Sequence, residues 1–321
     1  MREHILGPAS PASKDAAVAP GNAPPPAEAV LETGLADKAR AYFALTKPRI
    51  IELLLVTTVP AMVVAQRGWP PADLIIWTLV GGALAAGGAN AINCYVDRDI
   101  DSIMGRTRRR PLPAHRVRPV NALIFGATLG LLSFALLWIT VNSMAAVLAL
   151  SALLFYVFVY TIALKRTTPQ NIVIGGAAGA VPVLVGWAAV TGTIEAPALA
   201  MFGIIFYWTP PHFWALSMRY ESDYAAAGVP MMPVVYGRAE TTRHIVLYSL
   251  LLLAMCLILF SVARMGFIYL GAAMVLNALF VAGALRLRRD PTTDRAWSLF
   301  RYSISYLALL FAAMAADQLI T

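Results

Sequence analysis

The sequence lacks charge. Asp, Glu, Lys and Arg make up only 13% of the 321 residues, whereas 59% are hydrophobic. A soluble domain usually contains about 25% charged residues, so a soluble globular protein is excluded. There are only two cysteines, Cys94 and Cys256, and no CxxC motif, which argues against a disulfide framework or a Cys/His metal cluster. The alternating segments of about ten residues that form membrane β-barrels are also missing. The composition therefore predicts a polytopic helical membrane protein.

The N-terminal part of the chain differs in composition from the rest. Residues 1–40 are rich in Ala, Pro and small polar residues and contain no long hydrophobic run. Such a composition cannot bury a core, and a secretory signal peptide would need an apolar segment. We predict a disordered cytoplasmic tail at 1–40, followed by a single membrane domain at 41–321.

The remainder contains nine hydrophobic segments of a length that suits a membrane span, for which roughly 20 residues are needed. We expect each segment to form a helix, which gives an all-α, polytopic membrane bundle of nine transmembrane helices. The segments are approximately 50–66, 74–96, 120–140, 144–164, 171–191, 198–216, 244–263, 267–285 and 298–320.

The Lys and Arg residues are unevenly divided between the two ends of this expected bundle. Of 25 such residues, all except Arg67 and Arg264 fall in the N-terminal tail or in or beside the loops on the same side. Basic loops are retained on the cytoplasmic side. We therefore predict an N-in, C-out topology in a bacterial inner membrane, with the active site toward the cytoplasm. The same rule explains the pI near 9.7 without a nucleic-acid partner.

The loop after the second segment concentrates charge of both signs. Its sequence, NCYVDRDIDSIMGRTRRRPLP, begins at Asn93. Asn93, Asp97 and Asp101 are spaced four apart, so a helix would align them on one face, while Asp99 would point elsewhere. Carboxylates that continue an apolar helix usually mark a functional site. Mg²⁺ prefers oxygen ligands and commonly binds one or two carboxylates together with substrate phosphates. The spacing therefore predicts a Mg²⁺–diphosphate site.

Basic residues on the same side supply the complementary charge. Arg106 and Arg110 are also four apart, and Lys165 and Arg166 lie on another cytoplasmic loop. Arginine binds phosphate oxygens in a bidentate manner, and a metal with nearby cations offsets the charge of a departing diphosphate. We predict that these four residues bind diphosphate. The competing interpretation, in which Asp–Arg clusters at helix ends only set topology and form surface ion pairs, suits the other arginines of the loop better.

A second acidic group follows the sixth hydrophobic segment. Glu221 and Asp223 are predicted as further metal ligands, and His212 lies shortly before them. We predict Asp223 and His212, together with Asp97 and Asp101, as catalytic residues. The alternative for His212 is a histidine that is hydrogen-bonded near the membrane interface.

At these residues the sequence resembles a known family. NAINCYVDRDIDSIMGRTRRRPLP is similar to the first aspartate-rich motif of the intramembrane prenyltransferase superfamily. Three further blocks resemble its haem-farnesylating branch, the haem O synthases. They are KRTTPQNIVIGGAAGAVPVLVGWAAVTG (165–192), PPHFWAL (210–216) and DYAAAGVPMMPVVYG (223–237). The resemblance covers roughly residues 42–320. It implies a nine-helix bundle around a central cavity that opens to the cytoplasmic side.

The resemblance also implies an activity. This branch transfers a farnesyl group from farnesyl diphosphate to a vinyl group of haem b, with addition of water, giving haem O and diphosphate for haem-copper oxidase biogenesis. The Mg²⁺-binding role carries over to Asn93, Asp97 and Asp101, with Asn90 nearby at the diphosphate. His212 becomes a candidate for haem contact or proton handling. The resemblance leaves open whether the chain, surrounded by membrane lipid, docks onto a haem A synthase or an oxidase assembly factor.

One departure and two alternatives accompany this interpretation. Tyr220 and Tyr224 stand in the second motif where many superfamily members have aspartates, which puts a second carboxylate-bound Mg²⁺ in doubt. One alternative is a superfamily member that prenylates a quinone precursor. The other is a transporter, but transporters place polar sites near the bilayer midplane, whereas these charges gather on one face.

Overall fold

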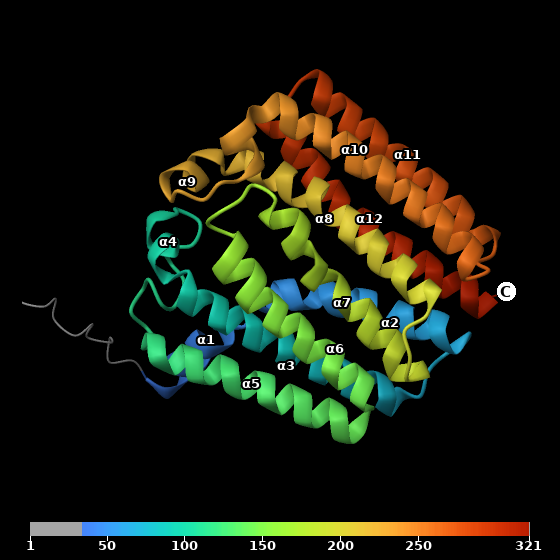
Figure 1. The fold of residues 1–321 in the computed structure, drawn as a ribbon, viewed down its shortest axis with the longest axis horizontal. Helices are drawn as coiled ribbons and strands as arrows, with labels where there is room; N and C mark the ends of the chain where they lie inside the picture. Colours follow the sequence, from blue (N-terminus) through green and yellow to red (C-terminus); the bar gives the residue numbers. More distant parts are fainter. Residues whose placement is uncertain (1–33, 321) are drawn as a thin grey trace, which may run out of the picture.

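The computed structural model describes residues 34–320, except for the side chains of 49–55. All the regular structure in these residues is helical (Figure 1). In chain order the helices are α1 (Leu35–Leu45), α2 (Pro48–Gln66), α3 (Ala72–Val96), α4 (Arg98–Ile103), α5 (Pro119–Thr140), α6 (Ser143–Leu154), the π-helix η1 (Phe155–Leu164), α7 (Asn171–Thr191), α8 (Ala196–Arg219), α9 (Glu221–Ala226), α10 (Met232–Val262), α11 (Phe267–Arg289) and α12 (Thr293–Ile320).

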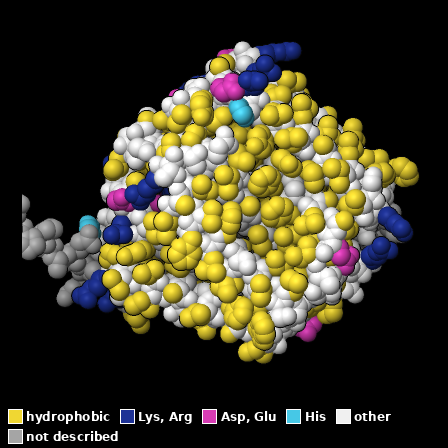
Figure 2. Space-filling view, viewed as in Figure 1, with side chains coloured by type: hydrophobic (Ala, Val, Ile, Leu, Met, Phe, Trp, Pro, Cys, Tyr) yellow, Lys and Arg dark blue, Asp and Glu magenta, His cyan; other side chains and the backbone are white. Residues whose placement is uncertain are grey.

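Most of the long helices suit a membrane. Within the described residues, seven helices have the length and hydropathy of a membrane span: α3, α5, the continuous α6–η1 segment, α7, α10, α11 and α12. Hydrophobic side chains cover most of the face seen in Figure 2, with charged residues toward its edges. The all-α membrane fold is therefore confirmed. Helices α2 and α8 coincide with the other two predicted segments but are not among the seven, so the number nine stays a prediction.

Two groups of neighbouring helices form the bundle. Helices α3, α5, α6 and α7 pack against one another in succession, and α8, α10, α11 and α12 form the second group. Helix α7 joins the groups by packing on α8, while α2 contacts both α7 and α12. The largest apolar core lies mainly in the second group, where Trp214, Tyr269, Phe280 and Tyr306 are fully buried. This core anchors the C-terminal half against α2 and α7.

Helices α3 and α5 approach each other closely because glycines meet at their contact. A Cβ atom on Gly88 would lie 2.6 Å from the carbonyl oxygen of Gly126, and one on Gly126 would lie 2.8 Å from that of Gly88. Small residues allow this kind of backbone contact between helices in a membrane. The contact fixes α3, whose last turn carries the acidic motif.

The polar segments gather at one end of the bundle. Helices α4 and α9 lie together there (Figure 1), and Arg106, which follows α4, donates a 3.2 Å hydrogen bond to the hydroxyl of Tyr224 on α9. Helix α3 ends at this end, and α2 and α7 begin there. The predicted boundary of the N-terminal tail at residue 40 falls inside α1, because helix formation begins at Leu35. The predicted disorder of the tail concerns residues that, up to 33, lie outside the described part.

Candidate active site

The acidic motif continues α3 by one further turn. The backbone N–H of Asp97 donates to Asn93 O at 2.9 Å, and that of Asp101 donates to Asp97 O at 2.8 Å. This four-residue spacing carries across the α3–α4 junction, so the side chains of Asn93, Asp97 and Asp101 follow one stripe, as predicted. All three are buried, with Asp97 completely inaccessible, whereas the side chain of Asp99 is 61% exposed. The stripe therefore faces the interior of the protein.

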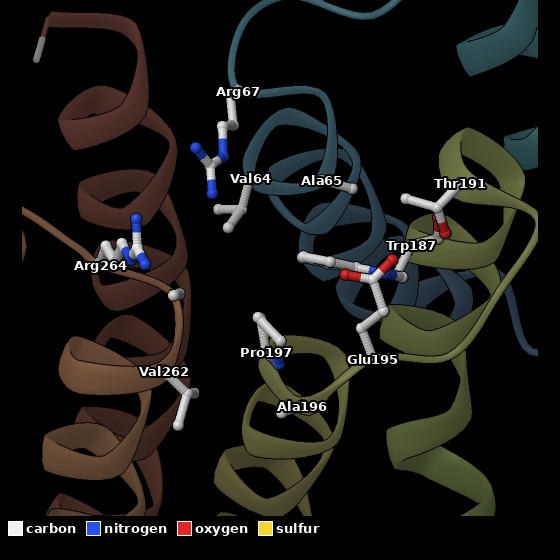
Figure 3. A pocket seen from close by; sticks show the side chains of 11 residues that line it. Val64, Ala65, Arg67, Trp187, Thr191, Glu195, Ala196, Pro197, Val262 and Arg264 are labelled. Atoms are coloured by element: carbon white, nitrogen blue, oxygen red, sulfur yellow. The ribbon is translucent and has the colours of Figure 1, made fainter.

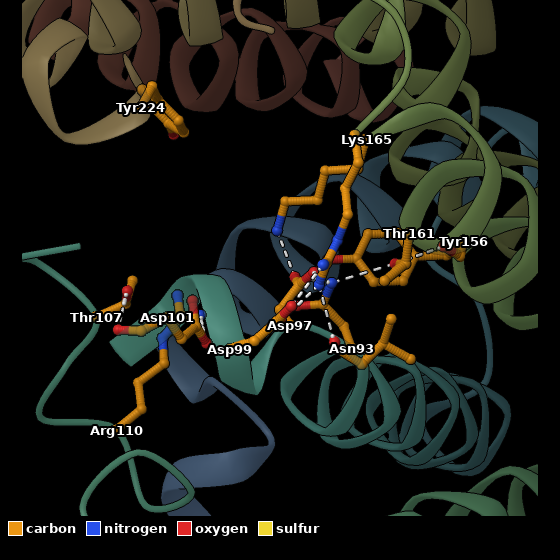
Figure 4. A network of polar contacts seen from close by, with 12 residues as sticks. Asn93, Asp97, Asp99, Asp101, Thr107, Arg110, Tyr156, Thr161, Lys165 and Tyr224 are labelled. Atoms are coloured by element: carbon orange, nitrogen blue, oxygen red, sulfur yellow. Dashed lines mark hydrogen bonds and ion pairs between the residues drawn. The ribbon is translucent and has the colours of Figure 1, made fainter. Parts of the chain in front are cut away.

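Asn93 is the centre of a hydrogen-bond network (Figure 4). Its Nδ2 donates to Asp97 Oδ2 at 2.7 Å and to Thr161 Oγ1 at 3.1 Å. Its Oδ1 accepts a 2.6 Å hydrogen bond from Lys47 Nζ. Residues of α3, η1 and the segment before α2 thus meet at one amide group. Asn93 holds the acidic stripe in register with two other parts of the chain.

Asp97 has an incomplete set of partners. Its Oδ2 accepts hydrogen bonds from Asn93 and from Lys165 Nζ. Its Oδ1 is buried and has no hydrogen-bond donor among the described residues, and the nearest guanidinium nitrogen of Arg166 is 3.8 Å away. A buried carboxylate oxygen without a partner is costly. A cation that entered the site would satisfy it.

The neighbouring aspartates have their own arginine partners. Asp101 Oδ2 accepts a 2.6 Å hydrogen bond from Arg110. Asp99 accepts two from Arg166, at 2.6 and 2.7 Å, and these bonds lower the pKa of Asp99 to about 2. Arg166 also donates to Val96 O at 3.0 Å. Arg110, Lys165 and Arg166 thus all lie at the stripe, and their binding of diphosphate stays a prediction.

The π-helix η1 places Thr161 and Lys165 at the site. Its turns are wider than those of an α-helix: Thr161 Oγ1 donates to the carbonyl of Tyr156, five residues earlier, and the N–H of Lys165 donates to the carbonyl of Tyr160. Short π-helical segments inside longer helices are frequent at functional sites. The sequence predicts only one continuous helix over 144–164, so this local change is not visible in the hydrophobic pattern.

Lys47 is a site residue that the sequence analysis missed. It precedes α2 with a left-handed backbone (φ 54°), a conformation that is unfavourable for a residue with a side chain. Its ammonium group lies against Asn93, and burial lowers its pKa to about 8. The available signal was a lysine directly before Pro48, at the start of the first apolar segment and on the same predicted side as the acidic loop.

The second acidic group faces the first from α9. A Cβ on Gly105, in the loop after α4, would lie 3.6 Å from the carboxylate of Asp223. Arg106 lies between the two groups, with its guanidinium 5.2 Å from the ring centroid of Tyr220. Glu221, predicted as a metal ligand, instead accepts a 2.9 Å hydrogen bond from Arg238, which also donates to Pro291 O at 3.2 Å. The structure therefore places Asp223 beside the acidic loop, and Glu221 at a junction with the α11–α12 loop.

Two further predicted site residues, Asn90 and His212, lie beside the acidic stripe or away from it. Asn90 donates a 2.9 Å hydrogen bond to Thr46 O, which holds the residue before Lys47 in place. His212 is buried between α8 and α12, with its Nδ1 2.6 Å from Ser303 Oγ and its ring stacked on Trp208. Among the described residues, its hydrogen-bond and ring partners lie on α8 and α12 and not on the acidic stripe, and its catalytic role stays a prediction.

The donor atoms of the stripe suit a hard cation. In the described part of the chain, no three His, Cys, Asp or Glu side chains lie together as a ready set of metal ligands. Asp97 and Asp101 nevertheless offer oxygen atoms, and one oxygen of Asp97 has no hydrogen-bond donor among the described residues. Mg²⁺ usually takes one or two carboxylates and completes its shell with water and substrate phosphate. The stripe fits that mode and not an all-protein metal cage.

Comparison with known proteins agrees with these observations. A model of the UbiA prenyltransferase family matches residues 54–311. The protoheme IX farnesyltransferase of Parafrankia sp. (strain EAN1pec) is 54% identical over 287 residues, which cover 88% of this chain and 92% of that protein. The protein of the same name from Roseiflexus sp. (strain RS-1) is 50% identical over 293 residues, or 91% of this chain, which spans about half (55%) of that relative's length.

Solved structures support the fold. A structure of digeranylgeranylglyceryl phosphate synthase superposes with a TM-score of 0.74 at 18% identity, covering 89% of this chain and all (100%) of that one. A UbiA homologue from Archaeoglobus fulgidus bound to GPP and Mg²⁺ gives 0.58 at 16% identity, with coverage of 85% and 99%.

Proposed function

This chain belongs to the UbiA prenyltransferase family, and we propose that it transfers a farnesyl group from farnesyl diphosphate to a vinyl group of haem b. The products are haem O and diphosphate. The acceptor and the length of the isoprenoid are inferred from relatives named protoheme IX farnesyltransferase, which are half or more identical to this chain over most of its length. The site geometry supports the diphosphate part of the reaction independently.

The observation that carries the proposal is the environment of Asp97. Its carboxylate is fully buried and forms ion pairs with Lys165 and Arg166, and one of its oxygens has no hydrogen-bond donor among the described residues. Lys47 and Arg110 lie on its neighbours Asn93 and Asp101. Four cations thus surround two buried aspartates at one end of the bundle. They suit a ligand of high negative charge that arrives with a divalent cation.

The basic residues act on the leaving group. The bond between C1 of the farnesyl group and the diphosphate oxygen breaks, and its electron pair leaves with the diphosphate. Lys47, Lys165 and Arg110 stabilise the charge that accumulates on those oxygens. Such stabilisation is strong because these groups are already held in place at a largely buried site. Arg106, between the loop and α9, is positioned to hold the far end of the diphosphate.

The apolar bundle serves the second half of the reaction. The vinyl carbon bonds to C1 of the farnesyl group, and the neighbouring carbon becomes positively charged. The oxygen of a water molecule adds to this carbon and a proton is released, which gives the hydroxyl of haem O. The surrounding helices must exclude water until the carbon–carbon bond has formed.

The oxygens of Asp97 and Asp101, with the amide oxygen of Asn93, would hold Mg²⁺. When bound, the ion neutralises charge on the diphosphate and acts as a Lewis acid. The Mg²⁺ in the A. fulgidus homologue supports this assignment. We assign Asp223 to the opposite wall of the site, and Glu221 to the anchoring of Arg238. His212 is assigned to the packing of α8 against α12.

We further propose that the protein lies in a bacterial inner membrane with this site toward the cytoplasm. The support is the concentration of Lys and Arg at the end of the bundle that carries the site. Farnesyl diphosphate would then reach the site from the compartment that contains soluble diphosphates. Association with a haem A synthase or an oxidase assembly factor would give the apolar product a direct route onward.

The decisive experiment uses the purified chain in detergent or nanodiscs with haem b, farnesyl diphosphate and Mg²⁺. Mass spectrometry of the extracted pigment should show the mass of haem b plus one farnesyl group and one hydroxyl group. Parallel reactions with 4-hydroxybenzoate as acceptor, and with geranylgeranyl diphosphate as donor, test the two substrates separately. Prenylated 4-hydroxybenzoate in the absence of any modified haem would overturn the proposed acceptor.

A further inference from the structure

A second polar site lies at the opposite end of the bundle from the acidic stripe. A cavity of about 490 Å³ opens where α2, α7 and α10 end and α8 begins (Figure 3). Apolar residues from α2, α8 and α10 form much of its wall. Arg67, Arg264, Glu195, Thr191 and Trp187 supply the polar groups. The volume falls within the usual range for small-molecule sites, about 300–1,000 Å³.

The two arginines stand out by their position and by their backbone conformation. They are the only Lys or Arg residues in the loops that close this end of the bundle, and both line the same cavity. Each follows a helix with a left-handed backbone (φ 52° in both), where glycine is the usual residue. Neither side chain makes an ion pair or hydrogen bond with another described residue. Two unpaired guanidinium groups are thus held at one opening, although glycine would suit the backbone better.

The opposite wall of the cavity contains complementary groups. The side chain of Trp187 is buried, with an exposed fraction of 5%. Its indole N–H has no hydrogen-bond acceptor in the described part of the chain. Glu195 carries a negative charge, and its carboxylate accepts one hydrogen bond in the described part of the chain, from the Thr193 hydroxyl at 3.1 Å. Figure 3 shows Arg67 and Arg264 on one side of the cavity and Glu195 with Trp187 on the other. The cavity therefore presents positive charge on one wall and negative charge on the facing wall.

We propose that this cavity binds the headgroup of a zwitterionic phospholipid that carries a primary ammonium group, such as phosphatidylethanolamine. The phosphate lies between Arg67 and Arg264, which suit its oxygens geometrically. The ammonium group lies against Glu195. In the predicted topology the ends of α2, α7 and α10 lie at the membrane surface, so the acyl chains can extend along the apolar helices. Glu195 argues against a ligand with only negative charges, because it would repel such a ligand.

Native mass spectrometry of the purified full chain, delipidated in a neutral detergent, tests this directly. Titration with phosphatidylethanolamine, phosphatidylglycerol and diacylglycerol gives the fraction of protein that retains each lipid. We expect the wild type to prefer phosphatidylethanolamine and to retain diacylglycerol least. The double variant Arg67→Gln/Arg264→Gln should lose about tenfold in affinity for both phospholipids, since charge-assisted contacts to phosphate are removed. Glu195→Gln should lose only the preference for phosphatidylethanolamine over phosphatidylglycerol.

The matched control is Arg116→Gln/Arg118→Gln, which removes the same charge from exposed positions at the other end of the bundle. It should retain lipids as the wild type does. Equal retention by the Arg67/Arg264 double variant, or equal loss in the control, would overturn the proposal. Displacement of the bound phospholipid by stoichiometric haem b would also overturn it, because the cavity would then belong to a substrate. Thermal unfolding of each variant in the same detergent excludes misfolding as the cause.

Discussion

Replacement of Asp97 by asparagine removes one negative charge from the centre of the acidic stripe and almost no volume. Asp97 is fully buried and accepts from both Asn93 and Lys165. If this charge holds the cation that carries the diphosphate, the rate should fall about 10²–10³-fold, as with the loss of other groups that stabilise developing charge. The assay is the initial rate of haem O formation, followed by mass spectrometry at saturating farnesyl diphosphate.

The same substitution also disturbs folding, and the two effects must be separated. Loss of one partner of a buried ion pair costs about 3–5 kcal/mol of unfolding free energy, because the other charge stays buried. The Lys165 side chain is 15% exposed, against 0% for Asp97. The loss of unfolding free energy should therefore be near the lower end of that range for Asp97→Asn. It should be near the upper end for Lys165→Met, which leaves the buried carboxylate in place. The double variant Asp97→Asn/Lys165→Met removes both charges and should unfold close to the wild-type temperature.

The double variant decides between the two roles of the pair. If Asp97 and Lys165 act on the substrate, the double variant is well folded and still inactive, with a rate below about 1% of wild type. If the pair only stabilises the bundle, the rate returns together with the stability. A double variant that keeps more than about a tenth of the wild-type rate has an activation barrier raised by roughly 1.4 kcal/mol or less. That result would refute the catalytic reasoning.

Three further predictions test other parts of the structure. Lys47→Met should raise the KM for farnesyl diphosphate about tenfold or more, since a charge-assisted contact to phosphate is lost, whereas Lys38→Met at an exposed position of α1 should leave it unchanged; equal KM values would remove Lys47 from the site. Chelation of divalent cations with EDTA should abolish product formation without unfolding the chain, and Mg²⁺ should restore activity; full activity in EDTA would exclude the metal. Gly88→Ala should destabilise the protein by about 1–3 kcal/mol through overpacking against Gly126 O, while Gly271→Ala, with open space around its Cβ, should not; thermal unfolding of both variants in one detergent measures this.

Much of the fold follows from hydrophobic length alone. The predicted segment 171–191 coincides with α7, and 144–164 matches α6 and η1 within one residue. The prediction of 244–263 misses the first part of α10, which begins at Met232. That part contains Arg238 and other polar residues at the bundle end, and Gly237 interrupts its helical backbone with φ 74°. A hydropathy argument detects the membrane-embedded part of a helix and not its polar extension.

The candidate site was only partly visible in the sequence. The four-residue spacing of Asn93, Asp97 and Asp101 predicts a common face because helical geometry is local. Lys47 is 46 residues from Asn93 in the sequence, and no local rule connects them. The ion pair of Glu221 shows the same limit, because no local rule connects it with Arg238, which lies on the next helix with its Nε 2.9 Å from the carboxylate.

The wide turns of η1 have a consequence for any mutational scan of this segment. Its backbone hydrogen bonds join residues five apart, as the bond from the N–H of Lys165 to the carbonyl of Tyr160 shows, so each turn contains more residues than the 3.6 of an α-helix but fewer than five. Substitutions placed at intervals of three and four, as for an ordinary helix, would drift around the axis and mix positions that border α3 with positions on other sides. A scan that alternates steps of four and five would stay on one side of the segment from the bundle interior to the reacting end.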